Sequence, residues 1–379
     1  MQTNVLIETI DTHTAGEPTR IVTGGIGPDA LRGDTVLERR DRFERTSDDL
    51  RRLLMCEPRG HDDMFGAVPV EPAAPEADLG LFFFDGGGYL EMCGHGTIGT
   101  ITALIETGQL PPSPEVVVET PAGLVHARPT VSGGHVERVE FENVESFVYD
   151  SLTVRLSGTR PPVADGGRGD ASRSEDGASD DASLGEDGAS DDASLGEDGA
   201  SDDAIRGEEL TIPVDVVFAG NVFALVDVTT LGLAVEPGSI DALVDLGLSI
   251  RRAVNEDRSI VDPFTGDRRP VSIVEFYDPS RDPDRNLVVF GDGQVDRSPC
   301  GTGTCAKMTL LHEAGELDVG ERYRYESVIG TRFTGRLLGA DRRDGHTVTR
   351  PTVGGQAYIT GRHTFLRDDR DDLGGFSLG

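Results

Sequence analysis

Apolar residues along this 379-residue chain occur mainly in short runs that are typical of strands. Such runs are rich in β-branched and aromatic residues and are bounded by glycine, proline or aspartate. They predict strands at 4–10, 81–84, 115–120, 122–128, 136–142, 214–219, 222–228, 271–277, 286–290 and 357–360. Helical spacing of apolar residues predicts helices at 47–54, 95–107, 238–254 and 302–314. Strand-rich segments around one helix occur twice, which favours two similar lobes of mixed α+β structure.

Two of the predicted helices begin with nearly the same sequence. Residues 93–110 read CGHGTIGTITALIETGQL, and residues 300–317 read CGTGTCAKMTLLHEAGEL. The two segments align without a gap and share a Cys-Gly-X-Gly-Thr start, which indicates two copies of one supersecondary unit. Two copies related by pseudo-symmetry would present the thiols of Cys93 and Cys300 to one cleft. That geometry is needed to act on both faces of a single carbon atom.

The start of each helix predicts a site for an anion and a reactive thiol. Glycine lets the backbone approach a ligand closely, and the first N–H groups of a helix have no partner within it. A substrate carboxylate placed there would be held by backbone amides and by the helix dipole. The same field is expected to lower the pKa of each thiol from about 8.5 towards neutrality.

Other interpretations of the cysteines are less favoured. A single buried cysteine is often a small core residue, but packing does not require Cys-Gly at both equivalent positions. A disulfide between Cys93 and Cys300 is disfavoured in a chain with four cysteines and no secretory signal. Cys56 and Cys305 are predicted to be core residues. A metal site using Cys93 and His95 lacks a pattern that completes four ligands, so no metal is expected.

The charge of the chain indicates a surface adapted to very high salt. There are 68 acidic and 35 basic residues, the net charge is −33, and Lys307 is the only lysine. Hydrated carboxylates keep such a protein dissolved, while salt screens their mutual repulsion. A surface of this kind disfavours nucleic acid and anionic membranes as partners. The sequence has no stretch of 18 apolar residues and no basic N-terminal region, so we expect a soluble cytoplasmic protein.

One acidic segment is predicted to be a disordered surface insert at about 160–207. The motif EDGASDDASLG occupies 175–185, recurs at 186–196 and begins again at 197–204. It lacks the apolar residues that offset the entropy of ordering a chain. Residues 165–209 carry 16 acidic side chains and three arginines, so the rest of the chain still has a net charge of −20. The acidity is therefore a property of the whole protein.

Several long motifs resemble the proline racemase family, which includes the 4-hydroxyproline 2-epimerases. They are MCGHGTIG (92–99), DRSPCGTGT (296–304), DTHTAGEPTRIV (11–22), EPRGHDDMFGAV (57–68), GNVFALVD (220–227) and AYITGRHTF (357–365). The resemblance covers nearly the whole chain except the acidic insert, and the acidic composition is similar to that of haloarchaeal proteins. The family resemblance implies two pseudo-symmetric, diaminopimelate-epimerase-like lobes. Each lobe is a curled sheet around a central helix, and the active site lies between the lobes.

The resemblance also implies a division of the chain. Residues 1–125 and 357–379 would form the N-terminal lobe, on which the C-terminal segment packs. Residues 126–356 would form the C-terminal lobe, interrupted by the insert. A small-molecule substrate, proline or hydroxyproline, is the expected partner, and a homodimer is left open.

Site residues follow from the resemblance by motif. Cys93 and Cys300 would be the two acid/base groups of a cofactor-independent epimerisation, one acting as thiolate and the other as thiol. Backbone amides would hold the substrate carboxylate, and an aspartate would contact its amine. These substrate-binding positions are Gly94, His95, Gly301, Thr302 and, for the amine, Asp296.

The resemblance favours one substrate over two others. CGHGT resembles the first motif of the 4-hydroxyproline epimerases, whereas proline racemases tend towards CGHNS. Relatives that dehydrate trans-3-hydroxy-L-proline typically carry threonine at the position of Cys300. The favoured reaction is therefore conversion of trans-4-hydroxy-L-proline to cis-4-hydroxy-D-proline, with proline racemisation and then dehydration as alternatives. Gly96 and Thr97 are expected to face the substrate ring, providing space and a hydroxyl group.

Overall fold

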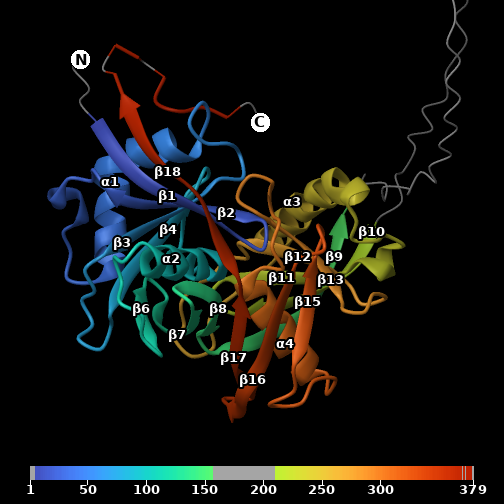
Figure 1. Cartoon of the computed structure of the whole chain (residues 1–379). Coiled ribbons are helices and arrows are strands. Elements are labelled where there is room, and N and C mark those ends of the chain that lie inside the picture. The colour runs from blue at the N-terminus through green and yellow to red at the C-terminus, as the bar shows by residue number, and fades with distance from the viewer. Residues whose placement is uncertain (1–4, 157–209, 369, 372, 378–379) are drawn as a thin grey trace, which may run out of the picture.

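The computed structural model describes residues 5–156, 210–368, 370–371 and 373–377. The predicted insert at 160–207 lies outside the described residues. In Figure 1 the first part of the chain forms one lobe around helix α2 and the later part forms a second lobe around α4. The red strand β18 leaves the second lobe and returns along β1. None of the described helices combines the length and apolarity that crossing a bilayer requires.

The first part of the chain contains strands and helices in this order: β1 (Val5–Thr14), β2 (Glu17–Gly24), the 3-10 helix η1 (Pro28–Leu31), α1 (Val36–Met55), β3 (Phe65–Val70), β4 (Leu79–Asp85), β5 (Tyr89–Leu90), α2 (Gly94–Glu106), β6 (Val116–Thr120), β7 (Gly123–Ser132) and β8 (His135–Glu142).

The remaining elements are β9 (Ser146–Leu156), β10 (Leu210–Phe218), β11 (Val222–Asp227), η2 (Val228–Leu231), η3 (Pro237–Ser239), α3 (Ile240–Asp257), β12 (Ile273–Asp278), β13 (Arg285–Phe290), β14 (Gln294–Asp296), α4 (Gly301–Glu313), β15 (Tyr323–Ser327), β16 (Arg332–Arg343), β17 (His346–Gly355) and β18 (Ala357–Arg367).

The same strand pairing occurs in both lobes. In the first, β1 and β2 are antiparallel, β2 is parallel to β3, β3 is antiparallel to β4, and β4 is parallel to β6. In the second, β10–β11, β11–β12, β12–β13 and β13–β15 repeat that sequence of directions. Strand β9 pairs antiparallel with β10, as β18 does with β1. The repeated helix motif is therefore part of a repeated lobe.

Each lobe surrounds one buried helix. Every residue of α2 except Glu106 is buried, as are the first nine residues of α4. Strands β1, β2, β3, β8 and β18 contact α2, and β9, β10, β11, β16 and β17 contact α4. One central apolar cluster includes Ile101 of α2 and Met308 of α4. Helices α1 and α3 pack on the outer faces over separate clusters.

The sequence predicted part of this structure correctly. All ten predicted strands and four predicted helices are present, most of them within a few residues. The exceptions are α1, which begins at Val36 rather than near residue 47, and β18, which continues to Arg367 rather than ending near residue 360. The first turn of α1 is capped by Thr35, whose side chain accepts a hydrogen bond from the Glu38 amide. The prediction missed β2, β3, β5, β9 and β14 to β17. The lobe boundary predicted after residue 125 lies within β7, and the division of the chain stays a prediction.

Candidate active site

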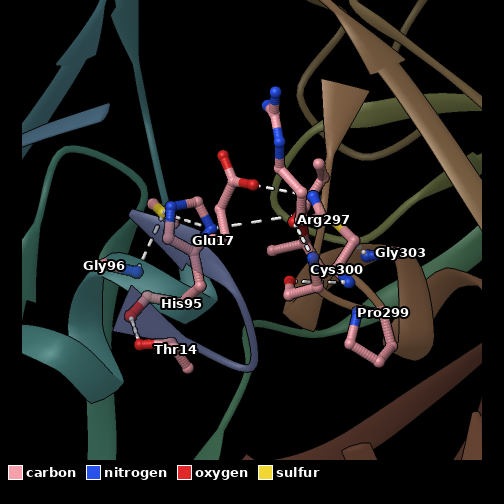
Figure 2. A network of polar contacts seen from close by, with 12 residues as sticks. Thr14, Glu17, His95, Gly96, Arg297, Pro299, Cys300 and Gly303 are labelled. Carbon is pink, nitrogen blue, oxygen red and sulfur yellow. Dashed lines mark hydrogen bonds and ion pairs between the residues drawn. The ribbon is translucent and has the colours of Figure 1, made fainter. Parts of the chain in front are cut away.

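Helices α2 and α4 meet at their N-termini. A methyl group added to Gly94 would lie 2.9 Å from Cα of Gly301, and one added to Gly301 would lie 2.9 Å from Cα of Gly94. Phe141 of β8 packs against both glycines. Glycine at these two positions is therefore required by the close approach of the helices. Figure 2 shows the two helix starts facing each other, with Glu17 between them.

Cys93 is the N-cap residue of α2. Its Sγ accepts a hydrogen bond from the Gly96 amide at 3.2 Å, and its backbone is extended, with φ −143°. The His95 ring lies beside the thiol, with Nδ1 at 3.4 Å and Nε2 at 3.6 Å from Sγ. Thr14 fixes the other side of His95, because its hydroxyl donates to the His95 carbonyl at 2.9 Å. The thiol is only 5% exposed.

Cys300 is the N-cap residue of α4 and has a different backbone. Its Sγ accepts from the Gly303 amide at 3.3 Å, but its φ is +57°, in the left-handed region that non-glycine residues seldom adopt. The hydroxyl of Thr302 lies 3.6 Å from Sγ. Ser298 stabilises the backbone that leads into this turn, because its Oγ accepts a hydrogen bond from the Cys300 amide at 3.1 Å.

A small cavity lies between the two thiols. Its volume is about 30 Å³. All seven site residues predicted from the sequence line it, together with Phe65, Leu90, Met92, Asn221, Ile273, Val288 and Phe290. Leu90, Asn221, Ile273 and Phe290 also border an open groove of about 670 Å³ on the surface. The predicted residues are therefore brought together, next to a route from solvent.

Two carboxyl groups are buried where the lobes meet: Asp296 lines the cavity, and Glu17 lies near it but is not part of its lining. Asp296 is 3% exposed, and burial raises its pKa to about 6, although the Ser298 amide donates to it at 2.8 Å. Glu17, at the start of β2, is fully buried and accepts from the Arg297 amide at 2.7 Å. Burial and the neighbouring Asp296 raise the pKa of Glu17 well above its usual value. Glu17 was not predicted as a site residue, although it lies within the family-like motif DTHTAGEPTRIV (11–22).

The expected lowering of the thiol pKa values is wrong for this structure. Burial raises the pKa of Cys93, with Asp296 and Glu17 adding to it and the Gly96 amide opposing it. Burial likewise raises the pKa of Cys300, and Asp296 and Glu275 add to it. One amide hydrogen bond per thiol does not offset the loss of water and the nearby carboxyl groups. In this structure the surroundings of both cysteines therefore favour the thiol over the thiolate.

The expected position of Thr97 is also wrong. Its hydroxyl donates to the Cys93 carbonyl at 2.7 Å, and neither Gly96 nor Thr97 lines the cavity. A methyl group on Gly96 would instead meet Cys93 Sγ and the ring of Phe83. The polar side chains that do face the cavity are His95, Asn221, Asp296 and Thr302. Burial lowers the pKa of His95 to about 3, so its ring is neutral.

The other cysteines have the expected surroundings. Cys56 is 8% exposed and Cys305 is fully buried, which confirms both as core residues. All four thiols are free. Over the described residues, no group of three or more His, Cys, Asp or Glu side chains is arranged to hold a metal ion.

Comparison with known proteins identifies the family. A family model described as proline racemase matches residues 9–159 and 202–377. The chain belongs to the proline racemase family. The family's proline racemase from Clostridioides difficile is 39% identical over 374 residues, which cover 97% of this chain and 96% of that protein. A trans-3-hydroxy-L-proline dehydratase from Bacillus thuringiensis subsp. konkukian (strain 97-27) is 35% identical over 386 residues and is matched over the whole of both chains.

A solved structure of the same family has this fold. The hydroxyproline epimerase from Agrobacterium vitis, with bound trans-4-hydroxy-L-proline, superposes with a TM-score of 0.78 and 28% identity. The match covers 100% of this chain and 97% of that one. The predicted family and the two-lobed α+β fold are confirmed. The chain is accordingly an isomerase of the amino-acid racemase and epimerase class.

Proposed function

We propose that the protein epimerises 4-hydroxyproline at Cα, converting trans-4-hydroxy-L-proline to cis-4-hydroxy-D-proline with two cysteines and no cofactor. The observation that carries the proposal is the placement of two thiols, each capping a buried helix, on one cavity. A substrate bound between them would present opposite faces of its Cα to Cys93 and Cys300. The family membership supports amino-acid epimerisation as the class of reaction.

In the proposed mechanism the protons balance within one turnover. One cysteine, as thiolate, removes the Cα proton and becomes a thiol. The other, as thiol, gives its proton to the opposite face and becomes a thiolate. A protein with the two roles exchanged runs the reverse reaction, so both directions need both residues.

The helix starts are suited to hold the substrate carboxylate. The Gly96 and Gly303 amides bond the thiols, and the helices offer no acceptor to the N–H groups that precede them. We assign those N–H groups, of Gly94, His95, Gly301 and Thr302, to the carboxylate. Donors fixed in a water-excluded site stabilise the charge that develops on this carboxylate as Cα loses its proton.

Asp296 and Glu17 are suited to receive the substrate ammonium group. Both are buried, and a positive charge beside them would favour their ionised forms. The ammonium would also favour a thiolate over a thiol. Substrate binding would therefore oppose the rise in thiol pKa values that burial causes.

The proposed substrate is tested against proline. The cavity wall contains the neutral His95 ring, Asn221 and Thr302, which can hydrogen-bond a ring hydroxyl. A site built for a hydroxyl discriminates strongly against the analogue without it. We expect kcat/KM for trans-4-hydroxy-L-proline to exceed that for L-proline by at least about tenfold, measured by NMR and chiral chromatography at high KCl.

Proline racemisation is the second candidate, and two observations favour it. Much of the cavity lining is apolar, including Phe65, Leu90, Ile273, Val288 and Phe290. The proline racemase of Clostridioides difficile also shares 39% of its residues with this chain. Equal rates, or a preference for proline, would assign the protein to this activity. Loss of water with formation of a pyrroline from 3-hydroxyproline would instead indicate a dehydratase.

We further propose that the protein is cytoplasmic and works at high salt. The net charge of −33 with a single lysine is the observation behind this proposal. Screening of like charges weakens as salt is removed, so stability should fall sharply below about 1 M KCl. Melting temperatures measured from low to high KCl test this expectation, and a constant value would contradict it.

A further inference from the structure

A buried carboxyl group lies directly behind the start of helix α4. Glu275 of β12 is fully buried. Its Oε1 accepts hydrogen bonds from the Tyr325 hydroxyl at 2.7 Å and from Asn286 Nδ2 at 3.4 Å. Its Oε2 has no hydrogen-bond partner within the described part of the chain and abuts Gly303, where an added methyl group would clash with it. Gly303 is the residue whose amide bonds the Cys300 thiol.

The other lobe has an apolar wall at the corresponding place. Glu275 pairs with Val288 across β12 and β13, and Ala67 pairs with Phe83 across β3 and β4. A methyl group added to Gly96 would meet the Phe83 ring. The first turn of α2 is therefore backed by an aromatic ring and the first turn of α4 by a carboxyl group.

The network around Glu275 also reaches the backbone of the Cys300 turn. Asn286 Nδ2 donates to the carbonyl of Pro299 at 2.8 Å as well as to Glu275. Pro299 immediately precedes Cys300, whose φ is +57°. A left-handed non-glycine residue costs on the order of 1–3 kcal/mol and persists only where its surroundings hold it. Asn286, oriented by Glu275, is one of the groups that hold it.

The charge of Glu275 opposes ionisation of the neighbouring thiol. Burial raises the pKa of Glu275 to about 7, which is below the usual pKa of a thiol. Its negative charge is therefore present by the time Cys300 would lose its proton. Other charged groups also face this region: Asp296 beside the thiol, and Lys307 and Asp284 beyond Glu275. Lys307 Nζ lies 3.3 Å from the centre of the Tyr277 ring rather than in an ion pair with Glu275.

We propose that Glu275 is a positioning residue for Cys300, which holds its turn through Asn286 and keeps this thiol harder to ionise than an apolar wall would. The two thiols then respond differently to pH, although they cap equivalent helices. This inference rests on the proposed function, in which Cys300 is one of the two acid/base groups. Its test measures thiol reactivity without turnover, so its failure is distinguishable from failure of the proposed function.

The experiment compares alkylation of the two thiols in one protein. Wild type and Glu275→Gln are treated with iodoacetamide from pH 6 to 9, and peptide mass spectrometry gives the rate at Cys93 and at Cys300. Both thiols line one cavity, so iodoacetamide must enter the same space to reach either of them. The ratio of the two rates is therefore independent of how readily the reagent enters the cavity. We expect Glu275→Gln to raise the Cys300:Cys93 ratio at pH 8 by at least about tenfold, equivalent to one pKa unit.

A matched variant separates charge from packing. Tyr325→Phe removes a hydrogen-bond donor to the same carboxylate, which raises the pKa of Glu275 but keeps the side chain ionisable. The two variants are therefore compared at pH 9, where the carboxylate of Tyr325→Phe keeps its charge, and this variant should change the ratio by less than about threefold. An unchanged ratio in folded Glu275→Gln, or an equal change in Tyr325→Phe, overturns the proposal. If Glu275→Gln does not fold, the pH dependence of the Cys300:Cys93 ratio in the wild-type protein tests the proposal instead. This ratio must fall as the pH passes about 7, where Glu275 ionises, and a constant ratio overturns the proposal.

Discussion

The turns at Cys93 and Cys300 begin equivalent helices but differ in their surroundings. Each Sγ accepts an amide hydrogen bond, at 3.2 Å and 3.3 Å, from the residue three positions later. Cys93 has an extended backbone, the neutral His95 ring beside it and Phe83 behind the helix. Cys300 has a left-handed backbone and Glu275 behind the helix. The repeated motif thus places two equivalent thiols on one cavity, while each lobe gives its thiol different neighbours.

The largest expected effect tests whether both turns are essential. Cys93→Ala and Cys300→Ala should each reduce epimerisation by at least about a thousandfold in both directions, because in the proposed mechanism each thiol supplies one obligatory proton transfer. Cys56→Ala and Cys305→Ala remove core thiols and should retain most activity. Substantial turnover by Cys93→Ala or Cys300→Ala would contradict the claim that both thiols are required.

A second pair of variants tests the contact between the two helix starts. A methyl group at Gly94 or Gly301 would lie 2.9 Å from Cα of the other glycine, so the helices must move apart. We expect Gly94→Ala and Gly301→Ala each to lower kcat/KM by about a hundredfold and stability by about 1–3 kcal/mol. Gly238→Ala is the control, because a methyl group there meets nothing within 4 Å. Equal activity in all three variants would show that the close approach is dispensable.

The pH dependence of stability sharpens the difference between the lobes. The pKa of Glu275 is raised from 4.5 to about 7 by burial, so its stabilising contribution is present below 4.5 and lost as the pH rises through about 7. The unfolding free energy of wild type relative to Glu275→Gln should fall by up to about 3 kcal/mol over that range. Urea unfolding at pH 5 and pH 8 measures the change.

Glu119 in the first lobe provides a control of opposite sign. Burial opposes ionisation there, but backbone amides, including those of Ala73 and Ala74, lower its pKa overall. Its contribution is therefore present above 4.5 and lost as the pH falls. The unfolding free energy of wild type relative to Glu119→Gln should therefore stay constant from pH 5 to pH 8 and fall from pH 5 to pH 3. A fall between pH 5 and pH 8, as expected for Glu275→Gln, would contradict the assigned difference between the lobes.

The sequence predicted the elements whose pattern is local and regular. The two helix starts repeat each other, and the core strands, such as 81–84, are continuous apolar runs. It missed β16 and β17, which contain arginine, glycine and polar residues and pair as a long hairpin. The first half of α1 was missed because its sequence from 36 to 46 is mostly charged, with Val36 and Phe43 as its buried residues.

The candidate site was predicted where the motif supplies the groups and missed where other strands supply them. The repeat predicted Cys93 and Cys300, and the family resemblance predicted their neighbours, all of which line the cavity. Glu17 and Glu275 reach the site from β2 and β12, so only a folded structure places them beside the thiols. A lone charged residue in the otherwise apolar run IVEFY was the available signal for Glu275. The sign of the thiol pKa shift was wrong because it depends on these distant carboxyl groups and on burial.

The most direct test of the two-thiol account is the early time course of epimerisation in D₂O. Trans-4-hydroxy-L-proline is incubated with the enzyme, and NMR follows deuterium at Cα in substrate and product while conversion is below about a tenth. Removal of the proton by one thiolate and donation from a solvent-exchanged thiol on the opposite face predict a fully deuterated product and an undeuterated remaining substrate. Product that retains the original proton, or substrate that exchanges before it converts, would contradict two separate thiols acting on opposite faces.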